Sequence, residues 1–222
     1  MPTPADLQRD LTRLTGLAAD DLAQIWRQVA TAAEAREALN DLLPALIRQY
    51  GEAAALLGAE WYDDLREQHL DTAPRFSAYP ADLPDQGTGA MIGWADRTST
   101  SLDAMQALIA GGMARRIADW ARETVMGSSF ADPLAEGWMR VGRPGACGFC
   151  RMIISRGAVY TESSVRFASH DSCHCGAAPK WGGVADVFDV EQYRRSARRA
   201  AMNDDTREAD NARTRDWIKS HL

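Results

Sequence analysis

Apolar residues in the first 30 positions recur every three or four residues, which is the spacing of an amphipathic helix. Thr3 is placed to cap a first short helix, and Gly16 is placed to end it. Asp20 and Asp21 then fall in the first turn of a second helix, where the helix dipole favours acidic side chains. We therefore predict two short helices before residue 31.

The longest apolar stripe covers residues 39–65. Thr31 and Glu34 match a capping box, in which each side chain satisfies a backbone amide of the other's turn. The stripe itself consists of Leu39, Leu43, Leu46, Tyr50, Ala54, Leu57, Trp61 and Leu65. Pro44 interrupts it and predicts either a helix restart near Asn40 or a mild kink, because proline lacks the amide that a helix interior requires.

Residues 72–97 contain several proline and glycine dipeptides and are predicted to form a long connector. A third strong helix is predicted over about 98–125, where apolar residues again recur at helical spacing. Gly111 and Gly112 weaken the middle of that helix by about 1 kcal/mol each, which predicts a close helix contact or a bend there.

After residue 127 the pattern changes to short segments bounded by turns. Residues 138–141, 152–154 and 158–160 are predicted strands, with a hairpin turn at 155–157 between the last two. A charged final helix is predicted over about 190–218. The expected fold class is mainly α (α+β): an elongated helical bundle or hairpin over 1–130, a β-containing module over 131–188 and a C-terminal helix over 189–222.

Composition places the chain among ordinary globular proteins. It has 45% hydrophobic and 25% charged residues, and its net charge of -6 argues against a dedicated nucleic-acid surface. No apolar run approaches the roughly 20 residues of a membrane span. The first residues lack the basic and apolar regions of a signal peptide, so we expect folding in a reducing cytoplasm, where cysteines persist as thiolates or metal ligands.

All four cysteines lie between residues 147 and 175, close to one histidine. The candidate metal ligands are Cys147, Cys150, His170, Cys173 and Cys175. Two cysteines separated by two residues form a tight turn that lets both sulfurs reach one tetrahedral zinc ion at about 2.3 Å. The spacing predicts a structural zinc site whose second ligand pair is brought back by a hairpin.

The candidates outnumber the four positions of a tetrahedral site. His170 with Cys173 is one choice for the second pair, and Cys173 with Cys175 is another, because alternate residues of a strand share a face. Disulfides and a catalytic zinc are the competing interpretations. The chain has no deaminase or His-Glu-x-x-His motif, which favours a structural clamp and predicts that the protein is not an enzyme.

The segments that carry this cluster resemble MuF-like minor head proteins of tailed bacteriophages, in particular those of actinobacteriophages. The matching stretches are 138–141, 146–152, 155–160 and 170–175. Residues 177–179 then match a short strand with a proline that ends the family pattern. Asp171 replaces a proline of that pattern and His174 replaces an arginine, so the role of that arginine is not carried over.

This resemblance implies a minor capsid protein of the virion that associates with the phage portal protein and takes part in head assembly. It would be made in the host bacterial cytoplasm and act without a membrane. Other capsid proteins are further expected partners. The resemblance also implies a stand-alone form without a fused protease or toxin domain.

A basic stripe on the predicted final helix is a candidate partner-binding surface. It consists of Arg194, Arg195, Arg198 and Arg199. Spacing of four residues puts these guanidinium groups on one face, where they would meet an acidic protein or phosphates of packaged DNA. A nucleic-acid-binding zinc module is therefore the first alternative function, and a metal-dependent hydrolase is the second.

Overall fold

The computed structural model describes residues 2–71, 73–85, 87–142, 150, 153–154, 167, 175–181, 203–206, 208–209, 212 and 216. Its helices are α1 (Pro4–Trp26), α2 (Ala32–His69), α3 (Thr88–Thr98) and α4 (Leu102–Ala131). Two strands, β1 (Ala135–Val141) and β2 (Gly176–Trp181), form a small antiparallel sheet. The prediction of a mainly α chain is confirmed, whereas the division into domains stays a prediction.

Helix α1 is one continuous helix, and the prediction that Gly16 ends it is wrong. Asp6 accepts a hydrogen bond from the backbone amide of Thr3 at 2.8 Å, which caps the start of the helix. The buried stripe then runs through the glycine from Leu7 to Trp26. A glycine costs a helix only about 1 kcal/mol, which the burial of this apolar face outweighs.

The second helix predicted from Asp20 is therefore part of α1. Helix α2 is also continuous, so the helix does not restart near Asn40. The predicted capping box is confirmed, since Glu34 and Thr31 each accept a bond from the other's amide at 3.2 Å. Pro44 lies inside the helix. At 1.5 Å per residue α2 is roughly 57 Å long. The fully buried Leu39 and Leu43 hold the helix together across the missing hydrogen bond.

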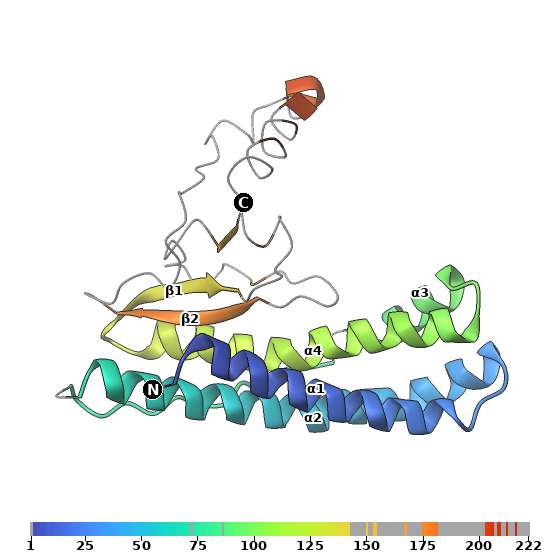
Figure 1. Cartoon of the computed structure of the whole chain (residues 1–222), viewed down its shortest axis with the longest axis horizontal. Coiled ribbons are helices and arrows are strands. Elements are labelled where there is room, and N and C mark those ends of the chain that lie inside the picture. The colour runs from blue at the N-terminus through green and yellow to red at the C-terminus, as the bar shows by residue number, and fades with distance from the viewer. Residues whose placement is uncertain are drawn as a thin grey trace.

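The predicted connector is shorter than 72–97, because α3 occupies its last third. Its described part, 73–85, runs back along the two long helices. Asp63 accepts from the amide of Ala78 at 2.8 Å, and Thr124 accepts from that of Ala81 at 2.9 Å. This return makes α2 and α4 parallel, so the helices form a bundle and not a simple hairpin (Figure 1). Helix α4 ends at Ala131, beyond the predicted residue 125.

The sheet packs lengthwise on α4 (Figure 1). Trp138 pairs with Pro179 and Val141 with Gly176, which confirms the strand predicted at 138–141. The strand predicted at 152–154 is wrong where it is described, since Ile153 and Ile154 are helical. A short apolar run alone does not distinguish a buried strand from a buried helix.

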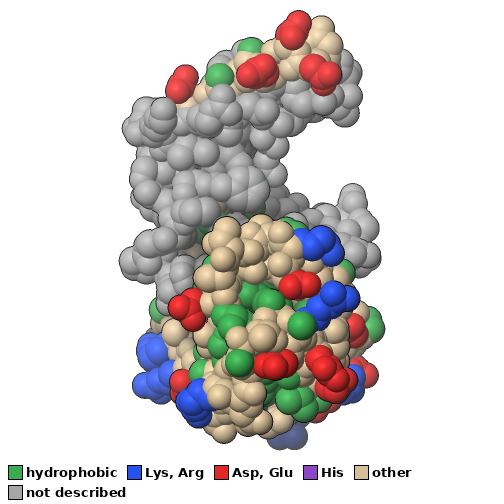
Figure 2. All heavy atoms as spheres, turned by 90° about the vertical axis from the view of Figure 1, so that its right-hand side faces the viewer, with side chains coloured by type: hydrophobic (Ala, Val, Ile, Leu, Met, Phe, Trp, Pro, Cys, Tyr) green, Lys and Arg blue, Asp and Glu red, His purple; other side chains and the backbone are tan. Residues whose placement is uncertain are grey.

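Other predicted elements lie largely outside the described residues. These are the strand at 158–160, the turn at 155–157 and most of the helix at 190–218, of which 204–206, 208–209, 212 and 216 are helical. Among the described helices, none combines the length and the apolar character of a membrane span. Viewed from the end that carries α3, acidic and basic side chains both border the hydrophobic ones (Figure 2).

Candidate metal centre

The pairing of β1 with β2 joins the chain segments that carry the two halves of the predicted metal site. Val141, at the end of β1, pairs with Gly176, at the start of β2. The segment with Cys147 and Cys150 follows β1 in the sequence, and the segment from His170 to Cys175 precedes β2. Both segments therefore leave the sheet at the same end.

Two of the five predicted ligands are described, and both are buried. Cys150 is 3% exposed and Cys175 is 0% exposed, and neither of these two thiols is in a disulfide. They belong to the apolar core that also contains Trp138 and Phe167. Buried, reduced sulfur is the soft donor that zinc takes up, so these two residues fit a thiolate metal site.

The remaining predicted site residues lie outside the described part of the chain. These are Cys147, His170, Cys173, Arg194, Arg195, Arg198 and Arg199. Within the described part, no three His, Cys, Asp or Glu side chains gather at one point. The ligand set and the basic stripe therefore stay predictions.

Arg122 of α4 links the helices to the cysteine-bearing segment. Its side chain is 3% exposed, and its Nε donates to the carbonyl oxygen of Cys175 at 3.0 Å. Its Nη1 lies 2.6 Å from Asp119, one turn earlier on the same helix. The guanidinium carbon also lies 4.9 Å from the ring centre of Phe167.

Phe167 is held from two further directions by β1. The guanidinium carbon of Arg140 lies 3.8 Å from its ring centre, and the Trp138 ring stacks on it at 5.7 Å with planes 23° apart. Cation–π contacts of desolvated arginines contribute about 2 kcal/mol each. Phe167, which precedes the second ligand cluster in the sequence, is thus held against β1.

A buried carboxylate fixes the other end of the sheet to the helices. Asp132, which is 2% exposed, accepts hydrogen bonds from Arg66 Nε at 2.7 Å, Trp181 Nε1 at 3.1 Å and the Tyr62 hydroxyl at 3.2 Å. It thereby joins α2, the end of α4 and β2. These bonds tie the end of the sheet to the two long helices.

The same cluster shifts two pKa values. Burial acts to raise the pKa of Asp132, but the bonds from Arg66, the Leu134 amide and Trp181 outweigh it and hold that pKa below its usual value. Burial, and next the Asp132 charge, raises the pKa of Tyr62 well above its ordinary range. At neutral pH the carboxylate is therefore charged and the phenol is neutral.

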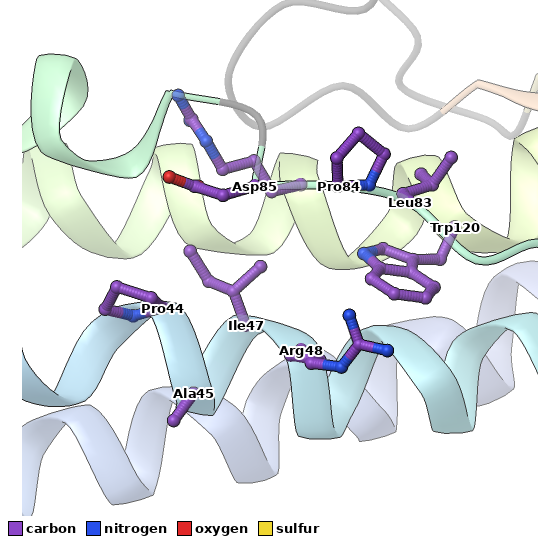
Figure 3. A pocket seen from close by; sticks show the side chains of 9 residues that line it. Pro44, Ala45, Ile47, Arg48, Leu83, Pro84, Asp85 and Trp120 are labelled. Carbon is purple, nitrogen blue, oxygen red and sulfur yellow. The ribbon is translucent and has the colours of Figure 1, made fainter.

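A separate cavity of about 240 Å³ lies between α2, the connector and α4 (Figure 3). Its lining consists of Pro44, Ala45, Ile47, Arg48, Leu83, Pro84, Asp85, Arg116 and Trp120. Arg48 pairs with Glu52 at 2.9 Å and with Asp82 at 3.1 Å. The hydroxyl of Thr88 donates to Asp85 and lowers its pKa. The charged groups named here stabilise the fold, and the rest of the lining is mainly apolar.

Several residues that build the site had no signal in the sequence. Arg122, Arg140 and Asp132 are charged residues next to apolar stripes, where a solvated position is the usual expectation. Only the spacing of Asp119 and Arg122, three positions apart on a helix, indicated an ion pair. Phe167 lay in a segment without periodicity.

Comparisons with known proteins connect the chain to bacteriophages. The model of the VG15 protein family matches residues 2–200. The chain is 31% identical over 145 residues to the Gene 15 protein of Mycobacterium phage D29, covering 62% of this chain and 52% of that protein. It is also 31% identical over 173 residues to the Gene 15 protein of Mycobacterium phage L5, covering 72% and 58%. The chain thus spans little more than half the length of these relatives. No solved structure matches it.

Proposed function

We propose that this chain, which belongs to the VG15 protein family with its phage-encoded members, is a structural minor head protein of a tailed phage. In this proposal it is of the MuF-like kind, associates with the portal vertex and takes part in head assembly. It carries a structural zinc ion and performs no catalysis.

The family match is the observation that carries the proposal. The matched range of 2–200 includes the helical bundle, the sheet and every candidate metal ligand. The MuF-like resemblance falls within that range and is densest around the cysteines. An elongated bundle with a small attached module suits a protein that binds between other virion components.

The zinc ion would be held by four of Cys147, Cys150, His170, Cys173 and Cys175. When bound, it supplies folding energy to its module and no reactive group. The described sheet has only two strands, and a two-stranded ribbon is at most marginally stable by itself. Packing on α4 supports one part of the ribbon, and the metal would support the segments that leave its other end.

Co-purification with the portal protein of the same genome tests the assembly role. We expect the tagged full-length chain, folded and loaded with zinc, to retain the portal protein through gel filtration. Portal protein that elutes separately under these conditions would contradict the assignment. A titration with duplex DNA distinguishes the nucleic-acid alternative, because phosphate binding weakens steeply as salt increases.

Zinc content and coordination test the metal assignment. We expect one zinc per chain by elemental analysis, and X-ray absorption showing four protein ligands without bound water. A coordinated water molecule would indicate an open position and favour the hydrolase alternative. A chain purified under reducing conditions that takes up no zinc would exclude the site.

A further inference from the structure

We propose that Arg122 is the positioning residue of the metal centre, because its side chain holds both ends of the segment that carries the second ligand cluster. This inference rests on the zinc site of the proposed function. It adds a residue on the helical bundle, far from the cysteines in sequence, to the machinery of that site.

Arg122 contacts the residues at the two ends of the segment that carries the second ligand cluster. At the first end its guanidinium lies 4.9 Å from the ring centre of Phe167, and at the second its Nε donates to the carbonyl of Cys175 at 3.0 Å. His170, Cys173 and Cys175 all fall within this span of the sequence. One buried side chain thus ties together the two ends of the segment that supplies the second ligand pair.

The anchor itself is rigid. Arg122 lies in the last third of α4, the helix that packs against α2 and both strands. Asp119 holds its Nη1 at 2.6 Å and balances its charge, so the guanidinium has a fixed direction. Arg140 adds a second cation to the Phe167 ring at 3.8 Å. The resulting frame joins α4 and β1 to Phe167 and to the carbonyl of Cys175.

Fixing both ends of a ligand-bearing segment reduces the entropy that metal binding must remove. A free segment has to be ordered when the ion binds, and that ordering weakens the apparent affinity. Partners outside the coordination sphere typically change metal affinity by about 10–100-fold when they are mutated. Loss of Arg122 should therefore weaken zinc binding without changing the ligands.

The position of Cys175 follows from the same contact. Ala177 pairs with Arg140, whose side chain reaches Phe167, and alternation along an extended strand places position 175 on the face of Ala177. Through Arg122 the helical bundle holds the backbone of Cys175 directly. His170 and Cys173, the other candidates for the second ligand pair, lie outside the described residues. In this proposal Cys175 is one ligand of the second pair, and the choice between His170 and Cys173 stays open.

Zinc competition against a chromophoric chelator tests this role in the full-length chain. We expect Arg122→Met to weaken zinc binding by roughly 10–100-fold and Arg122→Lys to restore part of the loss. Arg116→Met is the matched control: Arg116 is another buried arginine of α4, and its hydrogen-bond partners include Met91, Gly112 and Gly87. We expect its zinc affinity to stay within about twofold of the unmutated chain, since a general loss of packing does not reach the site.

Cobalt substitution supplies the spectroscopic readout. Arg122→Met loaded with Co²⁺ should keep the thiolate charge-transfer bands of the unmutated chain, whereas Cys175→Ser should lose intensity. Unchanged zinc affinity in Arg122→Met, or an equal loss in Arg116→Met, would overturn the proposal. If Arg122→Met does not fold, Phe167→Leu and Arg122→Lys replace it, and unchanged affinity in both would likewise overturn it. An unmutated chain that binds no zinc would refute the proposed function and, with it, this role.

Discussion

Single buried charges decide how the parts of this protein attach to one another. Asp132 receives three side-chain donors, from Arg66 and Tyr62 of α2 and from Trp181 of β2. Arg66 and Asp132 lie 66 positions apart in the sequence and are both buried. Such a pair adds little net energy compared with apolar packing, but removing one partner leaves an uncompensated charge.

Replacing Asp132 with Asn should therefore destabilise the protein strongly. The substitution keeps the shape of the side chain and leaves the Arg66 guanidinium without its counter-charge, at a cost of about 3–5 kcal/mol in free energy of unfolding. Urea denaturation measures this cost. Asp82→Asn is the control, because its carboxylate is 79% exposed and pairs with Arg48 at the surface, so its loss should cost less than about 1 kcal/mol.

The same residue predicts a dependence of stability on pH. The pKa of Asp132 is lower in the folded chain than in the unfolded one. Its contribution is thus present above the ordinary carboxyl pKa of about 4 and is lost as the pH falls through the folded value. The difference in unfolding free energy between the unmutated chain and Asp132→Asn should narrow as the pH drops from about 6 toward 2. A constant difference would contradict this linkage.

At the scale of the elements, the close contact of α2 with α4 depends on glycine. A Cβ on Gly51 would lie 2.5 Å from Cε2 of Trp120, a side chain that is only 3% exposed. A Cβ on Gly58 would lie 3.1 Å from the backbone oxygen of Ala121. The two parallel helices thus approach where α2 has no side chain, which lets the Trp120 indole lie between them.

Two glycine-to-alanine substitutions should have opposite effects on stability. Gly51→Ala should lower the free energy of unfolding by roughly 1–3 kcal/mol, because Trp120 must move out of a filled space. Gly16→Ala should raise it by about 1 kcal/mol, since no atom lies within 4 Å of the new methyl group and alanine favours the helix. Thermal unfolding compares them, and a rise in stability in both variants would show that helix propensity alone decides.

At the scale of the whole molecule, a long helical bundle supports a sheet and the cysteine-bearing module. The bundle has its own core, which includes the fully buried Leu39, Ile109, Met113 and Ile117. The sheet adds Trp138 and Trp181 to this core from outside. The bundle is therefore expected to stay folded when the module loses its metal.

Removing the metal should unfold the module and spare the bundle. Chelation, or Cys150→Ser, is expected to increase hydrogen exchange over about residues 137–180 while the amides of α2 and α4 stay protected, because most of the buried apolar side chains around these helices belong to the helices themselves. Hydrogen-exchange mass spectrometry resolves the two regions. Adding zinc back should restore protection in the chelated chain but not in the variant, and loss of protection throughout the bundle would show that the module is needed for the entire fold.

Much of the local structure was predictable from the amino-acid sequence. Apolar residues every three or four positions indicated the long helices, and both capping boxes begin where Thr3 and Thr31 predicted. The strand at 138–141 was also expected from its composition. These features depend on neighbours within a few residues, and periodicity and capping describe such neighbours well.

The candidate metal ligands were likewise predicted from the sequence, because the prediction used only residue types and their spacing. The assignment remains a prediction for all five candidates, of which Cys147, His170 and Cys173 lie outside the described residues. Their chemistry is local: a thiolate or imidazole binds zinc because of its own donor atom. The MuF-like resemblance was carried by the same residues, and the match to a phage family agrees with its coarser part.

Only the tertiary structure decided how these elements continue and meet. Helices α1 and α2 continue through Gly16 and Pro44. Burial of their apolar faces outweighs the helix stability that a glycine or a proline costs, and the sequence pattern alone gave that cost too much weight. The parallel arrangement of α2 and α4 depends on bonds that the returning connector makes to Asp63 and Thr124. Arg122 meets Cys175 across 53 positions of sequence. Contacts of that range leave no periodic signal, so they become visible only when the chain is folded.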